Sequence, residues 1–176
     1  MTIRRKSREG DEELVVDETA DPVARCSAMG RLLADRRFEF RRLARNWLDH
    51  PDPLLRDEAP AKLLIYFRDH PGVEADVARV KTLARTDPEP LVRGAAVRAL
   101  SSYLKLAKRD RSDILRTLVH VLETDDEWST QLTCYEELIE RIAPHRRNEV
   151  PSGKSGFDRS RQVDWDLLAE WREQNR

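Results

Sequence analysis

The stretch Asp87-Pro88-Glu89-Pro90-Leu91-Val92-Arg93-Gly94-Ala95-Ala96-Val97-Arg98-Ala99-Leu100 decides the fold of this chain. It begins with an Asp-Pro pair, continues with aliphatic residues and an arginine, and then carries alanines and a leucine at helical spacing. A related stretch runs from Asp52 to Ala59. Recurrence over tens of residues is typical of a solenoid, in which each helical hairpin buries its apolar face only against its neighbours. The repeat therefore predicts an all-α fold of stacked helical hairpins.

Length and composition limit the class of protein. The chain has 176 residues, enough for one domain, with 39% hydrophobic and 37% charged residues. Its net charge of -1 argues against a general binder of polyanions. No apolar run approaches the ~20 residues of a membrane helix, and no apolar segment follows the basic N-terminus as in a secretory signal. Because Cys26 and Cys134 lie on apolar helix faces, we expect a soluble protein of the reducing cytoplasm.

The chain divides into four parts by composition. Residues 1–20 are charged and predict a loosely held arm, residues 21–142 carry the helical repeats, residues 143–163 form a long basic loop, and residues 164–176 form an amphipathic helix that caps the open end. Periodicity and proline positions predict these helices within the repeats: from 22 to about 33, 37–49, 54–68, 73–85, 91–104, 112–123 and 127–142.

The hairpins align on three positions of their first helices. A small residue recurs as Ala28, Ala59, Ala96 and Cys134, where it would admit the neighbouring helix closely. Four residues later a leucine fills the core, at Leu32, Leu63, Leu100 and Leu138. Three residues before the small residue stand Arg25, Arg56, Arg93 and Gln131. We expect the arginines at this position to pair with the aspartates that precede the helices.

This recurring sequence pattern resembles that of the HEAT-repeat family, in particular the short HEAT-like repeats of bacterial proteins. The resemblance covers about residues 21–142 and is weakest at the fourth repeat, where Gln131 replaces arginine. It implies a right-handed superhelix of about four antiparallel helix pairs, an α-solenoid, whose second helices line a concave face that usually binds another protein. It implies no shared catalytic residues.

Arginines are the candidate partner-binding residues. Arg37, Arg41 and Arg45 stand at i, i+4 and i+8 of one expected helix and therefore share a face. If Arg79 and Arg116 point into the same concavity, the five residues would form a continuous basic groove for phosphates or an acidic protein. The alternative is a solvated face paired with neighbouring acids.

The basic loop 143–163 adds Arg146 and Arg147 to the candidate residues. A flexible basic loop of this kind could close over a partner, or it could serve only as a linker to the capping helix.

No pattern of catalytic or metal-ligating residues is recognisable. The histidines and cysteines lack ligand spacing, and Cys134 occupies the small-residue position of the repeat, which indicates packing. We therefore expect no metal, no cofactor and no enzymatic activity.

Three hypotheses of function remain open. The first is a scaffold that binds or regulates another protein with an acidic surface. The second is nucleic-acid binding or DNA repair, by analogy with alkylpurine DNA glycosylases built from HEAT-like repeats. The third, a special case of the first, is a bacterial immunity or enzyme-regulating subunit. The sequence leaves the oligomeric state open.

Overall fold

The computed structural model describes residues 2–107, 112–151 and 156–175. Over these residues the chain is helical and has no strand, which confirms the all-α class. The elements, in chain order, are α1 (Thr2–Val16), α2 (Pro22–Ala34), the 3-10 turn η1 (Phe38–Phe40), α3 (Arg41–Asn46), η2 (Trp47–Asp49), α4 (Pro53–Tyr66), α5 (Val73–Thr86), α6 (Pro90–Ala107), α7 (Ser112–Thr124), α8 (Trp128–Ile142), η3 (Pro144–Glu149), α9 (Arg159–Gln162) and α10 (Trp165–Gln174).

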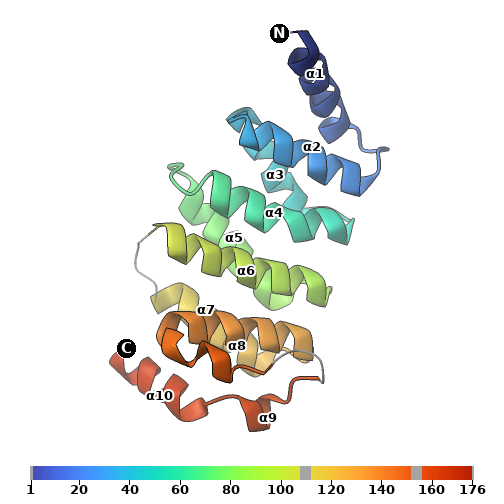
Figure 1. Cartoon of the computed structure of the whole chain (residues 1–176). Coiled ribbons are helices and arrows are strands. Elements are labelled where there is room, and N and C mark those ends of the chain that lie inside the picture. The colour runs from blue at the N-terminus through green and yellow to red at the C-terminus, as the bar shows by residue number, and fades with distance from the viewer. Residues whose placement is uncertain (1, 108–111, 152–155, 176) are drawn as a thin grey trace.

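The helices lie in two layers (Figure 1). We call α2, α4, α6 and α8 the front helices, because they are stacked one below the next in the view of Figure 1, each in contact with its neighbour. The back helices α3, α5 and α7 lie behind them, and each contacts the front helix that follows it in the chain. The N-terminal ends of the front helices therefore share one edge of the molecule, on the right of Figure 1.

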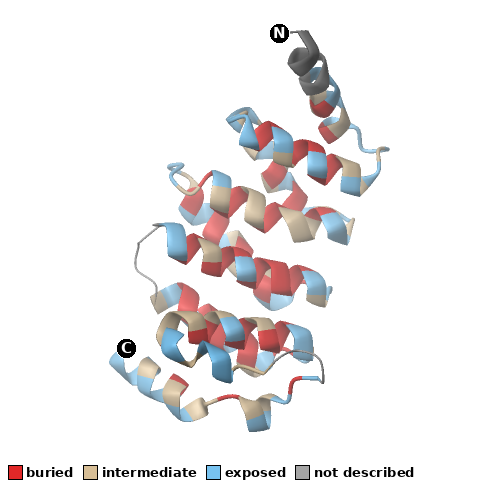
Figure 2. Ribbon diagram, viewed as in Figure 1, coloured by how far each residue is buried: buried red, intermediate tan, exposed pale blue. Residues whose placement is uncertain are grey.

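The aligned positions of the repeat form the core between the layers. Every small residue at the first aligned position is fully buried, and every leucine four residues later is at most 1% exposed. Buried residues recur on each helix of the stack (Figure 2). A residue no larger than alanine or cysteine lets two helix backbones approach, and the leucine one turn later fills the space that remains. The packing roles predicted from the repeat are confirmed.

Aspartate and proline begin α2 and α4 as the sequence suggested. The Asp21 carboxylate accepts a hydrogen bond from the Ala24 N–H, and the Asp52 carboxylate accepts one from the Leu54 N–H. Each satisfies an N–H group that would otherwise lack a partner in the first helical turn. Proline follows each cap at the position where a missing N–H costs nothing.

The N-terminal segment differs from the loose arm predicted for residues 1–20. Most of it forms α1, which packs against α2. Val15 is fully buried, and Asp11 accepts hydrogen bonds from Arg31 of α2, with 2.9 Å between Arg31 Nε and Asp11 Oδ2. The charge pattern of this segment suggested solvation, whereas buried Val15 and the ion pairs of Asp11 and Glu12 attach it to the stack.

Two further expectations are corrected. The loop predicted over residues 143–163 contains η3 and α9, and the part of it at 152–155 lies outside the described residues. Leu91, which the helical period of the predicted helix 91–104 places on its inward face, is 58% exposed at the start of α6. Its neighbour Val92 is fully buried instead, so the inward face of α6 begins one residue later.

Candidate binding surface

The predicted arginine stripe is divided by the local backbone. The expected continuous helix 37–49 consists of η1, the six-residue α3 and η2, and Arg37 stands before it as the capping residue of η1. A 3-10 helix has three residues per turn, whereas an α-helix has 3.6. The i, i+4, i+8 spacing therefore no longer places the three side chains on one face. Only Arg41 and Arg45 come together.

Arg41 and Arg45 meet at a buried carboxylate. Asp76 of α5 is inaccessible to solvent and forms ion pairs with both, with 2.8 Å between its Oδ1 and Arg45 Nε. Arg41 also donates to the Gly72 carbonyl at 3.0 Å. A buried carboxylate requires such partners, because an unpaired charge in the interior is costly. These two arginines therefore attach α3 to α5.

Arg37 pairs with Glu12 of α1 and with its neighbour Glu39, and its guanidinium lies 5.7 Å from the centre of the Phe40 ring. The hydrogen bonds that Arg37 donates to Glu12 and Glu39 raise its pKa. Arg37 therefore connects α1 to the rest of the stack and is not available to the stripe.

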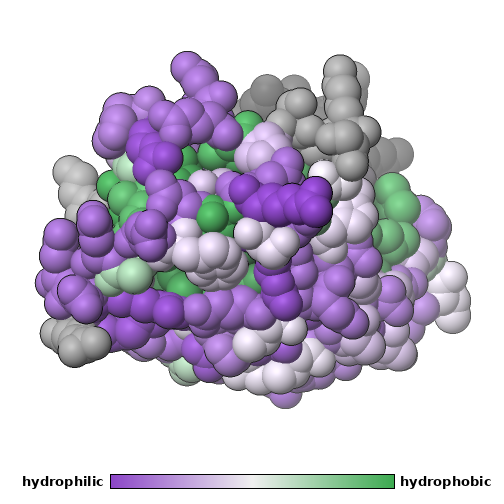
Figure 3. Space-filling model, turned by 90° about the horizontal axis from the view of Figure 1, so that it is seen from below, coloured by the Kyte–Doolittle hydropathy of each residue, from purple (hydrophilic) through white to green (hydrophobic). Residues whose placement is uncertain are grey.

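Arg79 and Arg116 do not share a groove. Arg79 of α5 pairs with Asp49 at the end of η2. Arg116 of α7 donates to the Asn175 carbonyl at 3.1 Å and to the Ser112 hydroxyl at 3.0 Å, beside a cavity of about 380 Å³ between α7 and α10. Figure 3, which looks onto this end of the molecule, shows hydrophobic side chains between hydrophilic ones. The continuous basic groove proposed from the sequence is therefore absent among the described residues.

The two arginines of η3 have different surroundings. Arg146 bridges Glu149 at 2.8 Å and Asp164 at 2.6 Å, and so links η3 to the start of α10. The pKa of Asp164 is lowered, first by the bond from the Leu167 N–H and then by Arg146. Arg147 has a side chain that is 71% exposed and lies 3.9 Å from Glu140. Of the two, only Arg147 is largely open to solvent.

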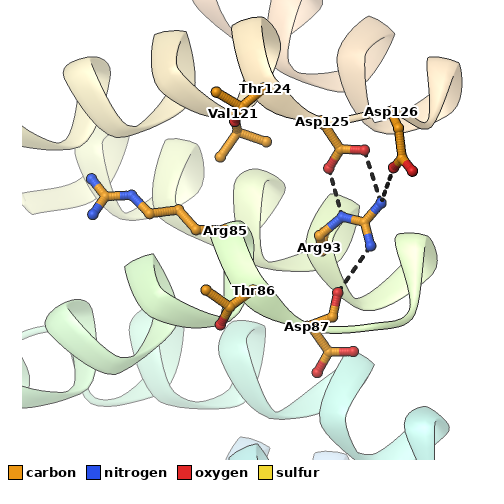
Figure 4. Close-up of a pocket in the computed structure, with 8 residues that line it drawn as sticks. All are labelled: Arg85, Thr86, Asp87, Arg93, Val121, Thr124, Asp125 and Asp126. Atoms are coloured by element: carbon orange, nitrogen blue, oxygen red, sulfur yellow. Dashed lines mark hydrogen bonds and ion pairs between the residues drawn. The ribbon is translucent and has the colours of Figure 1, made fainter.

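A groove lies instead at the edge where the back helices end and the front helices begin. Two cavities adjoin there, one of about 500 Å³ and one of about 320 Å³, and both are lined by Thr86 and Asp87. The larger lies between η2, α4 and α5, and the smaller between α5, α6 and α7 (Figure 4). We call the two together the turn groove. The remaining residues that line it are Leu48, Asp49, His50, Pro51, Arg56, Arg79, Thr82, Leu83, Arg85, Pro88, Arg93, Val121, Thr124, Asp125 and Asp126.

A ladder of arginine and aspartate forms the floor of the turn groove. Arg56 binds Asp87 with two hydrogen bonds of 2.8 and 3.2 Å, and Arg93 binds Asp125 with two of 2.5 and 2.8 Å (Figure 4). These bonds raise the pKa of both arginines. The expected pairing is confirmed for Arg56 and Arg93, each of which pairs with the aspartate of the following hairpin rather than its own. Arg25 instead donates to the Val15 carbonyl at 3.3 Å.

Each ladder residue also fixes the turn that precedes its own helix. Arg56 donates to the His50 carbonyl at 2.9 Å, and Arg93 donates to the Asp87 carbonyl at 2.9 Å. At the fourth hairpin Gln131 donates to the Asp125 carbonyl at 2.6 Å. The amide of Gln131 thus fixes its own turn as the arginines do, but it forms no pair with an aspartate of a following hairpin.

The reactive side chains in and near the turn groove have internal partners or lie in the core. The side chains of Arg56 and Arg93 are committed to the ladder, and Arg85 donates to the Thr117 hydroxyl at 2.9 Å. The free thiols of Cys26 and Cys134 lie in the core, where burial raises their pKa, that of Cys26 to about 11. In the described ranges no three histidine, cysteine, aspartate or glutamate residues cluster as metal ligands would.

Comparisons with protein-family models, with curated proteins and with solved structures found no match. Among the helices that the structure describes, none is long and apolar enough to cross a membrane.

Sequence reasoning missed the exposed apolar residues at the start of the front helices. Val23, Leu54, Leu91 and Trp128 are each exposed by about two fifths or more. The helical period assigned Leu91 and Trp128 to apolar stripes. A signal was nonetheless present, because three of the four follow a proline at the first helical position and precede the aligned arginine by two residues.

Proposed function

We propose that the chain is a non-enzymatic scaffold that binds another protein along the turn groove. The observation that carries this proposal is the repetition of one cavity type in successive hairpins, with Thr86 and Asp87 common to both cavities. A surface that repeats along a stack suits a ligand that is itself extended. The rigid ladder beneath the groove keeps the surface preorganised, which lowers the cost of binding.

The finer description of the fold belongs to the same proposal. Buried small residues and leucines at aligned positions support a right-handed α-solenoid of HEAT-like hairpins, closed at its C-terminal end by α10. Two free, buried cysteines suit the cytoplasm. An immunity or enzyme-regulating subunit would be one form of such a scaffold.

Nucleic-acid binding has less support. Phosphate recognition needs cationic side chains free to face the ligand. Each of the seven arginines singled out in the sequence has an internal carboxylate or carbonyl partner, and a phosphate would have to compete with it. The same argument weakens the expectation of an acidic protein partner at those arginines.

Photo-crosslinking from the groove tests the proposal. A benzophenone maleimide is attached to a Thr86→Cys variant, since Thr86 is exposed and the two native thiols are buried. The matched control carries the same reagent at Ala34→Cys, an exposed position at the opposite end of a front helix. In extract from cells that express the protein, we expect a defined partner to crosslink through position 86 and not through position 34. Equal recovery from both positions, or no protein above background at position 86, would refute the proposal.

A further inference from the structure

The strongest unexplained feature is an apolar row along one edge. Val23, Leu54 and Leu91 occupy the second position of α2, α4 and α6, and Trp128 is the first residue of α8. Their exposed fractions are 59%, 42%, 58% and 42%. A single exposed leucine needs no explanation, but large apolar residues within the first two positions of four neighbouring helices do.

The row runs in the direction in which the front helices are stacked. The N-terminal ends of α2, α4, α6 and α8 follow one another along the right edge of Figure 1. Packed helices lie roughly 8–10 Å apart, so the three steps from Val23 to Trp128 cover about 25–30 Å. The row therefore presents one apolar side chain about every 10 Å.

The same edge is strongly acidic, although the whole chain is balanced with 32 basic and 33 acidic residues. Four segments meet there, 17–24, 49–55, 86–92 and 124–129, and they contain ten acidic residues, while Arg25, Arg56 and Arg93 directly follow the first three segments. The acids are Asp17, Glu18, Asp21, Asp49, Asp52, Asp87, Glu89, Asp125, Asp126 and Glu127. We call these four segments, with the apolar row, the cap edge.

Internal pairing accounts for only part of this charge. Asp49, Asp87 and Asp125 are ion-paired with Arg79, Arg56 and Arg93 respectively.

The other carboxylates of the cap edge keep much of their charge toward solvent. Asp21, Asp52 and Glu127 cap helices, whose dipoles offset about half a charge each. Asp126 has a side chain that is 98% exposed, with Arg93 at 3.5 Å. The cap edge therefore presents negative charge beside an apolar row.

We propose that the cap edge docks a cationic amphipathic helix of a partner protein. A helix advances about 10.5 Å in seven residues, so an apolar residue at every seventh position meets one member of the row in each hairpin. Lysines and arginines on either side of that stripe face the acidic segments. Anionic lipids and nucleic acids are repelled by the same charge. This inference rests on the proposed scaffold function and names the partner's chemistry.

Fluorescence anisotropy with a designed probe tests this docking. The probe is a synthetic helix of about 21 residues, long enough to span about 30 Å, with leucine at every seventh position and lysine at the flanking positions. One control peptide has the same composition with the leucine spacing scrambled, and the other has glutamate in place of lysine. We expect the probe to bind, to weaken as salt rises, and to bind at least tenfold more tightly than either control.

Two matched protein variants locate the site. Leu54→Ser/Leu91→Ser removes the middle of the row, whereas Leu106→Ser changes an exposed leucine, 43% accessible, near the other end of α6. We expect at least tenfold weaker binding for the first and less than twofold change for the second, with unchanged circular dichroism. An Asp126→Lys variant also weakens binding. Equal binding to scrambled or glutamate peptides, or equal loss in both leucine variants, overturns the inference.

The two proposals fail separately. A partner that crosslinks through position 86 but binds the Leu54→Ser/Leu91→Ser variant normally leaves the scaffold function intact and overturns docking at the cap edge. Absence of any crosslinked partner at position 86 overturns the scaffold function itself, whatever the designed peptide does.

Discussion

Replacement of Arg93 by alanine tests the ladder most directly. The Arg93 guanidinium and the Asp125 carboxylate are almost completely buried against each other. Removal of one member of such a pair leaves a buried charge without its partner and costs about 3–5 kcal/mol of unfolding free energy. For a chain of 176 residues, a loss of this size lowers the melting temperature by roughly 6–20 °C. Urea unfolding followed by far-UV circular dichroism measures the free energy.

The repeat itself supplies the control substitution. Gln131 occupies the aligned position of the fourth hairpin and bonds only the carbonyl of its own turn. An Arg93→Gln variant therefore keeps the bond to the Asp87 carbonyl, worth about 1 kcal/mol, and loses the pair with Asp125. We expect it to be destabilised less than Arg93→Ala by about that amount.

A double-mutant cycle separates the pair from the general effect of truncation. Asp125→Asn removes the charge and keeps an oxygen that can accept from the Glu127 N–H, now at 2.8 Å. We expect a coupling of about 1–3 kcal/mol between Arg93→Ala and Asp125→Asn. If the two changes are additive, or if Arg93→Ala costs less than about 1 kcal/mol, then the ladder does not stabilise the stack as argued.

Two more predictions concern ionisable groups. The pKa of Asp164 is lowered in the folded protein, chiefly by the hydrogen bond from the Leu167 N–H. The charged carboxylate therefore stabilises the fold at pH values above its unfolded pKa of about 3.9. This contribution disappears as the pH falls through the folded pKa. Asp164→Asn should therefore cost about 0.3–1 kcal/mol at neutral pH and nothing in strong acid, in melting temperatures compared across pH; a cost that is independent of pH would contradict this. The two thiols should react slowly with a thiol reagent, because the pKa of Cys26 is about 11 and Cys134 is fully buried. We expect labelling of the folded protein at mildly alkaline pH to be far slower than labelling in urea. Labelling at equal rates would show that the core opens freely.

The sequence predicted the helices because their signals are local. Asp52 and Pro53 mark a helix start through bonds that span only a few residues, and the buried stripe of α7 follows from its own period. The packing positions were also predictable, since one structural unit recurs and Ala59 and Ala96 must meet the same neighbour in each copy.

The candidate site was less predictable because its contacts are distant in sequence. Arg41 lies 35 residues from Asp76, and nothing in the spacing of the arginines indicates which acid each one meets. The prediction of an arginine stripe also required a continuous helix, whereas a 3-10 turn lies on each side of α3. Exposure of Leu91 depends on where α6 rotates against α4, which the helical period leaves uncertain by one residue.

The direction of the ladder has a consequence for how the stack ends. Arg56 and Arg93 each reach forward to the turn of the next hairpin, so the third and fourth hairpins are each clamped by the one before. Gln131 holds its own turn but extends no clamp beyond α8. The fourth hairpin is thus marked as a terminus by a single side chain, and η3, α9 and α10 follow as a different kind of closure.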